Sequence, residues 1–218
     1  MKRMTLWVLA LVWLVACQTG PRLPQYDDPN LLFKDDFALT TSGWDSYSDS
    51  EKTTNYDNGQ YVIRVDTAGM SVWATPQLDF TNLKLEVDTQ YAGGPINNEF
   101  GLLCRYTRHG DGKHSFYFFV VSSDGYYALG KVVKDARTIL SPTHGDYAAT
   151  SALRLGETDI NHLTATCDGS RFALAVNGEE VGAFEDKDLT HGDVGVLAGT
   201  FDEPGVTIHF DNFEVRKP

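Results

Sequence analysis

The sequence predicts an all-β protein in which two antiparallel sheets stack as a sandwich. Apolar and polar residues alternate in short runs, glycine-containing turns separate the runs, and no segment after residue 20 sustains a helical period. The chain of 218 residues contains 20 glycines and 12% aromatic residues, a composition that favours strands and turns. A chain of this length is sufficient for one well-packed β domain.

Residues 160–185 carry the clearest pattern, in which three extended segments follow one another and two tight turns join them. Asp168-Gly169 and Asn177-Gly178 mark the turns, because both central residues of a tight hairpin turn adopt positive φ. Apolar residues alternate along one face of the first two segments: Leu163, Ala165 and Cys167, then Phe172, Leu174 and Val176. We therefore expect a three-stranded antiparallel meander here.

The first sixteen residues have the pattern of a signal peptide. Lys2 and Arg3 precede an uncharged apolar run, residues 6–16, that would rise only about 16 Å as a helix. That rise is too short for a hydrocarbon core of about 30 Å, so this run is not expected to span a membrane. We expect residues 1–16 to be removed on export.

Leu14-Val15-Ala16-Cys17 resembles the bacterial lipobox, in which the cysteine is lipidated and becomes the new N-terminus. The resemblance implies that Cys17 anchors an exported chain to a bacterial membrane, facing the periplasm or the cell exterior. Residues 17–30 would then be a lipidated cysteine and a tether, since residues 18–30 include three prolines and little apolar material. An ordinary signal peptide, in which Cys17 has no role, is the alternative.

Residues 31–218 are expected to form a single domain, without a repeat of fixed period. The formal net charge of −12 argues against nucleic acid or an anionic membrane surface as a partner of this domain, because like charges repel. The charge fits solubility and is compatible with cation binding.

The first strand of the domain is expected at residues 31–37, where Phe33 and Phe37 lie on one side. Further strands are expected at residues 61–65, 71–74, 83–91, 99–108, 114–122 and 126–133. Residues 116–121 are apolar on both faces, which predicts a central strand covered on both sides. Residues 142–158 have the least regular pattern and are expected to cross between two meanders.

The last strand contains an irregularity that predicts a β-bulge. Phe210 and the alternate apolar residues before it share one phase, whereas Phe213 and Val215 belong to the other phase. One extra residue at Asp211-Asn212 would return the last two apolar residues to the core side of the sheet.

Two cysteines remain once Cys17 is assigned to lipid. Cys104 and Cys167 both lie on apolar faces of expected strands. An exported protein folds in an oxidising compartment, so these two cysteines are expected to form a disulfide. Two free, buried thiols are the alternative, because cysteine is tolerated well in apolar interiors.

Intact catalytic motifs are absent from the sequence. The six histidines form no His-x-His or His-Glu-x-x-His pair, and no Gly-x-Ser-x-Gly elbow is present. Glu86-Val87-Asp88-Thr89-Gln90 resembles the Glu-x-Asp-x-Glu strand of laminarinase-type glycosidases, in which alternation places three acids on one face. Here Gln90 replaces the third acid, which removes the general acid/base that two-carboxylate hydrolysis needs. The solvated face of a half-buried strand is the favoured interpretation, and no catalytic residue is assigned.

A structural calcium site is a further hypothesis, although no cofactor is required. Asp35 and Asp36 lie in the first strand, and Asp211 and Asn212 lie at the expected bulge of the last strand. The terminal strands of a closed sandwich are often neighbours, and Ca²⁺ binds six to eight oxygen ligands. Alternatively, these acids cap strand ends or pair with nearby Lys and Arg residues.

Turn and core motifs over residues 31–216 resemble concanavalin/laminin-G-type jelly rolls, especially the bacterial branch grouped with 3-keto-disaccharide hydrolases. The resemblance lies in Phe33-Lys34-Asp35-Asp36-Phe37, Leu102-Leu103-Cys104-Arg105-Tyr106, Asn161-His162-Leu163, Cys167-Asp168-Gly169, Leu174, Val176-Asn177-Gly178, Gly192-Asp193-Val194-Gly195 and Phe210-Asp211-Asn212-Phe213-Glu214-Val215. It implies two facing antiparallel sheets, frequently with sugar bound on the concave face. Likeness of fold is a weak guide to activity.

Period-two counting places one row of side chains opposite the Cys104 face of the expected strands at residues 99–108, 114–122 and 126–133, which form a second three-stranded meander. The row consists of Leu103, Arg105, Thr107, Ser115, Tyr117, Phe119, Tyr127, Leu129 and Lys131. The candidate ligand-binding residues are Arg105, Tyr117, Tyr127 and Lys131, together with Trp73. Tyrosine rings and basic side chains suit glycan recognition. Alternatively, Tyr117 and Phe119 fill the core between the sheets.

These observations favour an exported, lipid-anchored binding module that recognises carbohydrate. A glycan-acting hydrolase of the 3-keto-disaccharide type, with Glu86 and Asp88 in acid/base roles, is the first alternative. An adhesion or assembly protein of the cell envelope is the second.

Overall fold

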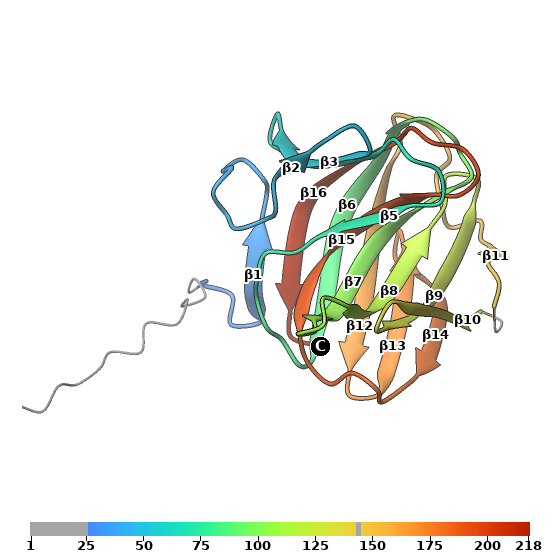
Figure 1. Ribbon diagram of the computed structural model, residues 1–218. Helices are drawn as coiled ribbons and strands as arrows, with labels where there is room; N and C mark the ends of the chain where they lie inside the picture. Colours follow the sequence, from blue (N-terminus) through green and yellow to red (C-terminus); the bar gives the residue numbers. More distant parts are fainter. Residues whose placement is uncertain (1–25, 143–144) are drawn as a thin grey trace, which may run out of the picture.

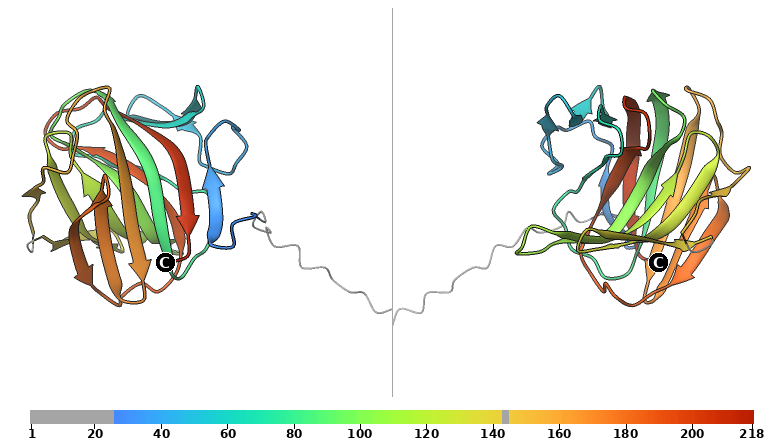
Figure 2. Two further views of the ribbon diagram at one scale, coloured as in Figure 1. Left: turned by 180° about the vertical axis from the view of Figure 1, so that it is seen from behind. Right: turned by 45° about the vertical axis from the view of Figure 1, so that its right-hand side comes forward.

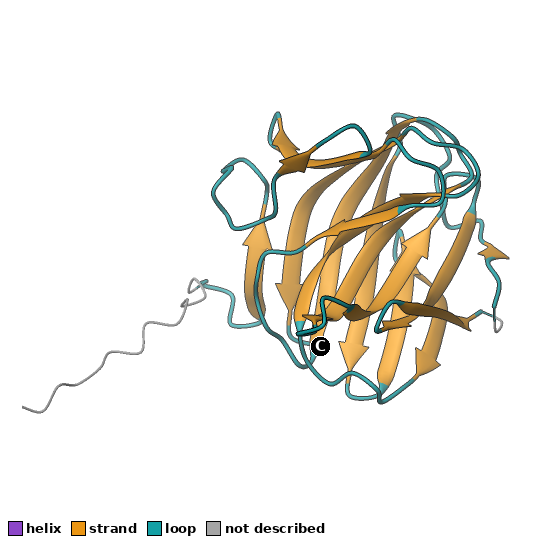
Figure 3. Cartoon of the chain, in the orientation of Figure 1, coloured by secondary structure: helices purple, strands orange, loops and turns teal. Residues whose placement is uncertain are grey.

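The computed structural model describes residues 26–142 and 145–218, and in these ranges the chain consists of strands and loops (Figure 3). The expected signal peptide, Cys17 and most of the expected tether lie outside the described residues. Within the described ranges, no helix is long and apolar enough to cross a membrane. The all-β prediction is confirmed.

Sixteen strands follow one another in the described part of the chain, and most of them are longer than five residues. Their bounds are β1 Leu31–Asp35, β2 Tyr47–Ser48, β3 Lys52–Asp57, β4 Gln60–Val65, β5 Ser71–Ala74, β6 Leu83–Gly93, β7 Asn98–Arg108, β8 His114–Val121, β9 Tyr126–Val133, β10 Ala136–Ser141, β11 Ala148–Ala149, β12 Ile160–Asp168, β13 Arg171–Val176, β14 Glu179–Glu185, β15 Asp193–Thr200 and β16 Val206–Arg216.

The strands form two antiparallel sheets that face each other (Figures 1 and 2). The nine-stranded sheet has the order β14-β13-β12-β6-β16-β4-β3-β2, and β1 also pairs with β16. The seven-stranded sheet has the order β10-β9-β8-β7-β15-β5, and β11 also pairs with β9. The chain crosses between the sheets from β11 to β12, within the segment 142–158 where the sequence predicts a crossing. The two-sheet antiparallel sandwich is confirmed.

The core lies between the two sheets and takes large apolar side chains from both. Burial alternates strictly along β6 from Leu83 to Gln90, so every second side chain points inward. Burying one such side chain contributes about 1.5–3 kcal/mol. The largest fully buried aromatic residues of this core are Tyr61, Tyr117, Phe37, Phe100, Phe119, Phe172, Phe210 and Phe213.

The meander expected at residues 160–185 is present as β12, β13 and β14. The Asn177-Gly178 turn has positive φ at both residues, as predicted. The first turn differs by one position, because Asp168 pairs with Arg171 and leaves Gly169-Ser170 as the turn residues. Only the glycine of that pair has positive φ, so the turn requires glycine at its first central position.

Strand β8 is buried on both faces, as the apolar run 116–121 predicts. Tyr117 and Phe119 face the core between the sheets. Phe118 faces the opposite side, where the Arg137 guanidinium of β10 lies 4.2 Å from the centre of its ring. Strand β10 runs crosswise in front of β7 and β8 in two views (Figures 1 and 2).

Period-two counting places Tyr117 of β8 on the face opposite Cys104 of β7, and this prediction is wrong. Cys104 pairs with Tyr117, and Leu103 pairs with Phe118. Since directly paired residues share a face, Tyr117 lies on the core face with Cys104 and not opposite it. The register shifts just after Cys104, where Arg105 has a φ of 55°, so counting through this bulge loses the phase.

The terminal strands β1 and β16 are neighbours, and Asp35 pairs with Phe213. The register of β16 with β6 shifts between Asp211 and Glu214, and Asn212 has a φ of 53°. Phe213 is fully buried. The predicted bulge is therefore confirmed, together with its effect on the apolar residues that follow it.

A disulfide joins Cys104 of β7 to Cys167 of β12, as predicted. The bond links the two sheets, because β7 belongs to the seven-stranded sheet and β12 to the nine-stranded sheet. It closes a loop of 63 residues, which corresponds to about 4 kcal/mol of stabilisation in the chain-entropy account.

We expect the double substitution Cys104→Ala and Cys167→Ala to lower the free energy of unfolding by about 4 kcal/mol, because the unfolded chain regains the freedom that the cross-link removes. Urea unfolding monitored by tryptophan fluorescence measures the change. Wild-type protein unfolded in a reducing agent is the control, since it loses the cross-link without creating a cavity. An unchanged midpoint in both samples would contradict the prediction.

Candidate functional site

A pocket of about 710 Å³ lies where four connections of the sandwich meet. The connections are β6–β7, β8–β9, β10–β11 and β15–β16, and we call the cavity the loop pocket. Its lining residues are Ile96, Asn97, Ser122, Asp124, Tyr126, Asp146, Tyr147, Phe201 and Asp202.

Asn98 holds two of these connections together, and it is fully buried at the start of β7. Its side-chain amide donates to the Pro95 carbonyl at 2.7 Å and to the Ser123 hydroxyl at 2.9 Å. Its side-chain oxygen accepts the Ser123 backbone N–H at 3.0 Å. In the β8–β9 turn, the Gly125 N–H donates to the Ser122 carbonyl. The residues at this rim of the pocket are therefore fixed by buried hydrogen bonds.

Tyr147 lines the loop pocket, and its hydroxyl is hydrogen-bonded to the buried Glu99. The Tyr147 hydroxyl donates to Glu99 Oε2 at 2.6 Å, and the Phe201 ring meets the tyrosine ring edge-on at 5.8 Å. Glu99 is only 1% exposed and also accepts two hydrogen bonds from Arg137, at 2.8 and 2.6 Å, and one from Ser71 at 2.6 Å. Strands β5, β7 and β10 thus converge on one buried carboxylate.

Charge pairing keeps Glu99 ionised despite its burial. Burial alone would raise the pKa of the Glu99 carboxyl, but the hydrogen bonds and positive charge of Arg137 outweigh it and hold the pKa below its ordinary value. Burial, together with the neighbouring Glu99 charge, raises the pKa of the Tyr147 phenol. At neutral pH the phenol is therefore protonated and donates its hydrogen bond to a carboxylate.

The lining of the loop pocket combines acidic and aromatic side chains. Asp124, Asp146 and Asp202 contribute carboxylates, and Tyr126, Tyr147 and Phe201 contribute rings. The lining residues include no Lys or Arg. Carboxylates accept hydrogen bonds from hydroxyl groups, and ring faces pack against C–H groups, whereas an anionic ligand would be repelled. The pocket therefore suits an uncharged ligand that is rich in hydroxyl groups.

The five residues expected to bind a ligand do not line the loop pocket. Tyr117 is buried in the core together with Phe119, in agreement with the core alternative, and Tyr127 is buried there as well. Lys131 forms ion pairs with Asp186 and Asp188. The Trp73 ring packs on the outer side of the seven-stranded sheet.

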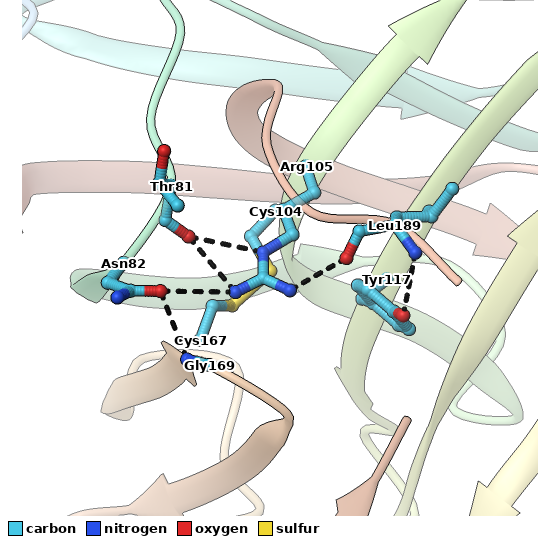
Figure 4. Close-up of a disulfide and its surroundings, with 8 residues drawn as sticks. All are labelled: Thr81, Asn82, Cys104, Arg105, Tyr117, Cys167, Gly169 and Leu189. Carbon is cyan, nitrogen blue, oxygen red and sulfur yellow. Dashed lines mark hydrogen bonds between the residues drawn. A yellow bond between two sulfur atoms is a disulfide. The ribbon is translucent and has the colours of Figure 1, made fainter. Parts of the chain in front are cut away.

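Arg105 lies in a different pocket, beside the disulfide (Figure 4). Its guanidinium donates to the backbone carbonyls of Thr81 and Leu189. The structure therefore distributes the expected ligand residues over separate places.

The residues of the calcium hypothesis come close together. Asp35, Asp36 and Asn212 line one pocket of about 320 Å³. Asp35 accepts hydrogen bonds from the Phe37 N–H at 2.8 Å and from the Trp44 indole at 2.9 Å. In the described ranges, no three His, Cys, Asp or Glu side chains are grouped so that they could hold a metal. Calcium binding by Asp35, Asp36, Asp211 and Asn212 stays a prediction.

The acidic row of β6 points away from the core and is already paired. Glu86 forms an ion pair with Lys84 at 2.5 Å, and Asp88 accepts from His162 Nδ1 at 2.8 Å. The Gln90 side chain donates to a backbone carbonyl of the β11–β12 connection. This arrangement agrees with the solvated face of a half-buried strand.

Sequence reasoning missed the loop pocket because its residues come from four connections that are far apart in the chain. Period-two patterns locate strands but do not show which loops meet at one end. The available signal was composition, since three of the four connections carry aromatic or acidic residues next to a turn: Asp124 with Tyr126, Asp146 with Tyr147, and Phe201 with Asp202. The fourth connection contributes Asn97.

No family model matches the chain, and no curated protein matches it significantly. Solved structures share its fold. The carbohydrate binding module CBM66 from Bacillus subtilis matches with a TM-score of 0.63 and 17% identity, covering 81% of this chain and 96% of that chain. A Bacillus subtilis protein of unknown function with a galectin-like fold matches with a TM-score of 0.64 and 10% identity, covering 88% and 98%.

A Bacillus licheniformis β-glucanase matches with a TM-score of 0.59 and 10% identity, covering 85% of this chain and 98% of that chain. At these identities the similarity establishes the fold alone. The chain has the jelly-roll sandwich that carbohydrate-binding and glucanase structures share.

We expect Glu99→Gln to lower the free energy of unfolding by about 3 kcal/mol at pH 7, because Arg137 loses its buried partner. The folded-state pKa of Glu99 lies below the unfolded value of about 4.3, so its stabilisation is present above that value and lost as pH falls through the folded pKa. Urea unfolding at pH 7 and pH 3 measures both effects. The difference in free energy of unfolding between wild type and Glu99→Gln should be smaller at pH 3 than at pH 7.

Glu179→Gln is the matched control, because it removes the same charge from an exposed position. It is expected to change stability by less than about 0.5 kcal/mol. Equal effects of the two substitutions at pH 7 would contradict a structural role for the buried carboxylate.

Proposed function

We propose that this protein is an exported, lipid-anchored module that binds uncharged carbohydrate in the loop pocket. The observation that carries the proposal is the lining itself, in which three carboxylates and three aromatic rings surround about 710 Å³ without a basic side chain. Cavities of this order hold small-molecule ligands in other proteins. The fold shared with a carbohydrate-binding module supports the proposal.

The exposed side chains of the lining are available to a ligand. Tyr126 is 42% exposed, and its ring offers a flat apolar surface to the C–H face of a sugar. Asn97 and Asp202 are exposed on two other connections, and neither side chain has a hydrogen-bond partner among the described residues. Hydroxyl groups of a sugar would donate to Asp202 and would both donate to and accept from Asn97.

Export and anchoring rest on the first seventeen residues, which lie outside the described residues. A positive start, a short apolar run and Leu14-Val15-Ala16-Cys17 support a lipidated N-terminus at a bacterial membrane. The prolines of residues 17–30 would hold the binding domain away from the lipid.

Hydrolysis of the 3-keto-disaccharide type and envelope adhesion have less support. The carboxylates that would act in hydrolysis, Glu86 and Asp88, are engaged by Lys84 and His162 outside the loop pocket. Incubation with oxidised and ordinary disaccharides tests for hydrolysis, and a product would favour the enzyme. Binding to envelope proteins without binding to any glycan would favour adhesion.

We expect Tyr126→Ala and Asp202→Asn each to weaken binding of a neutral glycan about tenfold, because each removes a contact of about 1.4 kcal/mol. A glycan array with the purified protein identifies the glycan, and calorimetry measures its affinity for each variant. Tyr47→Ala is the matched control, since Tyr47 is 51% exposed and lies on β2. Equal losses for the control, or no glycan bound at all, would contradict the proposal.

We expect Cys17→Ser to move the protein from the membrane fraction to the soluble fraction of the producing bacterium, because the substitution removes the sulfur that carries the lipid. Metabolic labelling with a radioactive fatty acid measures the modification directly. Label on wild type and none on the variant is the expected result. Unlabelled wild-type protein would show that the segment is an ordinary signal peptide.

A further inference from the structure

A second pocket, of about 470 Å³, has the opposite charge character to the loop pocket. We call it the basic pocket, and its lining residues are Thr81, Asn82, Arg105, Gly169, Ser170, Lys187, Leu189 and Thr190. Arg105 and Lys187 line it, and no Asp or Glu does. The pocket is therefore locally basic in a chain whose formal net charge is −12.

The two pockets lie at opposite ends of the sandwich. Strands β6 and β12 pair from Gln90 with Ile160 at one end to Leu83 with Cys167 at the other. The loop pocket lies beyond the first end, and the basic pocket lies beyond the second. A ligand of one pocket therefore does not contact the other.

Arg105 is the central feature of the basic pocket, and it is only 2% exposed. Its Nε and Nη2 donate to the Thr81 carbonyl at 3.2 and 3.0 Å, and Nη2 also lies 3.4 Å from Asn82 Oδ1 (Figure 4). Its Nη1 donates to the Leu189 carbonyl at 2.7 Å. Because a guanidinium carries five N–H groups, one N–H of Nη1 is left over.

Asp168 acts on the Arg105 charge only from beyond ion-pair distance and does not line the pocket, so this guanidinium has no ion-pair partner among the described residues. The Phe172 ring centre lies 4.9 Å from its Cζ on the core side. Buried cations are almost always paired, because removing a charge from water costs several kcal/mol per ion. Arginine does not lose its proton in proteins, so the charge persists.

The backbone at Arg105 is held in an unusual conformation. Its φ of 55° lies in the left-handed region that non-glycine residues seldom adopt, at the bulge that follows Cys104. Such strain persists where surrounding structure fixes it, and here the disulfide anchors the preceding residue. The guanidinium is therefore positioned before any ligand arrives.

Three further side chains of the basic pocket can donate hydrogen bonds to a ligand. Lys187 is exposed and forms no ion pair in the described part of the chain. The hydroxyls of Ser170 and Thr190 also line the cavity, and neither has a hydrogen-bond partner among the described residues. Two cations and two hydroxyls around one cavity match the acceptor oxygens of an oxyanion.

We propose that the basic pocket binds a ligand through a carboxylate group, which pairs with Arg105 and Lys187 and accepts from Ser170 or Thr190. The site does not depend on glycan binding in the loop pocket. A free organic acid and an acidic sugar are two sources of the same group.

Backbone amide NMR of the purified full-length protein in a non-ionic detergent tests the site with acetate and with acetamide, its uncharged counterpart, at constant ionic strength. Acetate is expected to shift the amide signals of Gly169, Ser170 and Leu189 in a saturable way, and acetamide is not. Equal shifts with both probes, or shifts elsewhere only, would overturn the proposal.

Substitutions distinguish binding in the basic pocket from non-specific attraction of anions to the protein surface. Lys187→Gln is expected to weaken acetate binding at least threefold, and Arg105→Gln to abolish it. Lys34→Gln removes the same charge from another pocket and is expected to have no effect. Should Arg105→Gln fail to fold, the double substitution Ser170→Ala and Thr190→Val replaces it, and it is expected to weaken acetate binding because it removes both hydroxyl donors. Equal losses for Lys187→Gln and Lys34→Gln would overturn the proposal.

Glucuronate and lactate then distinguish the two sources. If glucuronate binds more tightly than lactate, and Lys187→Gln still weakens its binding, the ligand is an acidic sugar. If lactate binds more tightly than glucuronate, the ligand is an organic acid. Failure of a neutral glycan to bind the loop pocket leaves these outcomes unchanged.

Discussion

The packing of two apolar sheet faces against each other is the constraint on which the rest of this structure depends. Each strand directs one row of side chains inward. The opposite row is partly exposed on β6, whereas on β8 a second apolar cluster buries it. The Cys104–Cys167 bond fixes one point of contact between the sheets. With the strands fixed in this way, the connections at the two ends of the sandwich form the cavities.

Charge divides the two ends of the molecule. The loop pocket has Asp124, Asp146 and Asp202 in its lining, and the basic pocket has Arg105 and Lys187. Each lining repels ligands of its own sign and tolerates uncharged ones, so the two cavities select different chemistry. A buried side chain supports each pocket. Glu99 accepts a hydrogen bond from Tyr147 at the loop pocket, and the Phe172 ring packs against the Arg105 guanidinium at the basic pocket.

Local pattern predicts much of the fold and little of the candidate site. Alternation identified β12 and β13, the phase change after Phe210 identified the bulge, and the expectation of export led to the correct pairing of Cys104 with Cys167. The phase of β8 against β7 was lost at Arg105, because a residue in the left-handed region breaks period-two counting. The loop pocket depends on which connections meet at one end, and residues as distant in the chain as Asn97 and Phe201 line it without leaving a periodic signal.

The place where a neutral sugar binds is the most direct test of the proposed function. Backbone amide NMR of the protein with a neutral oligosaccharide selected from the array measures this location residue by residue. We expect saturable shifts confined to the surroundings of Asn97, Tyr126 and Asp202. Shifts centred on the outward face of β6, around Glu86 and Asp88, would contradict it.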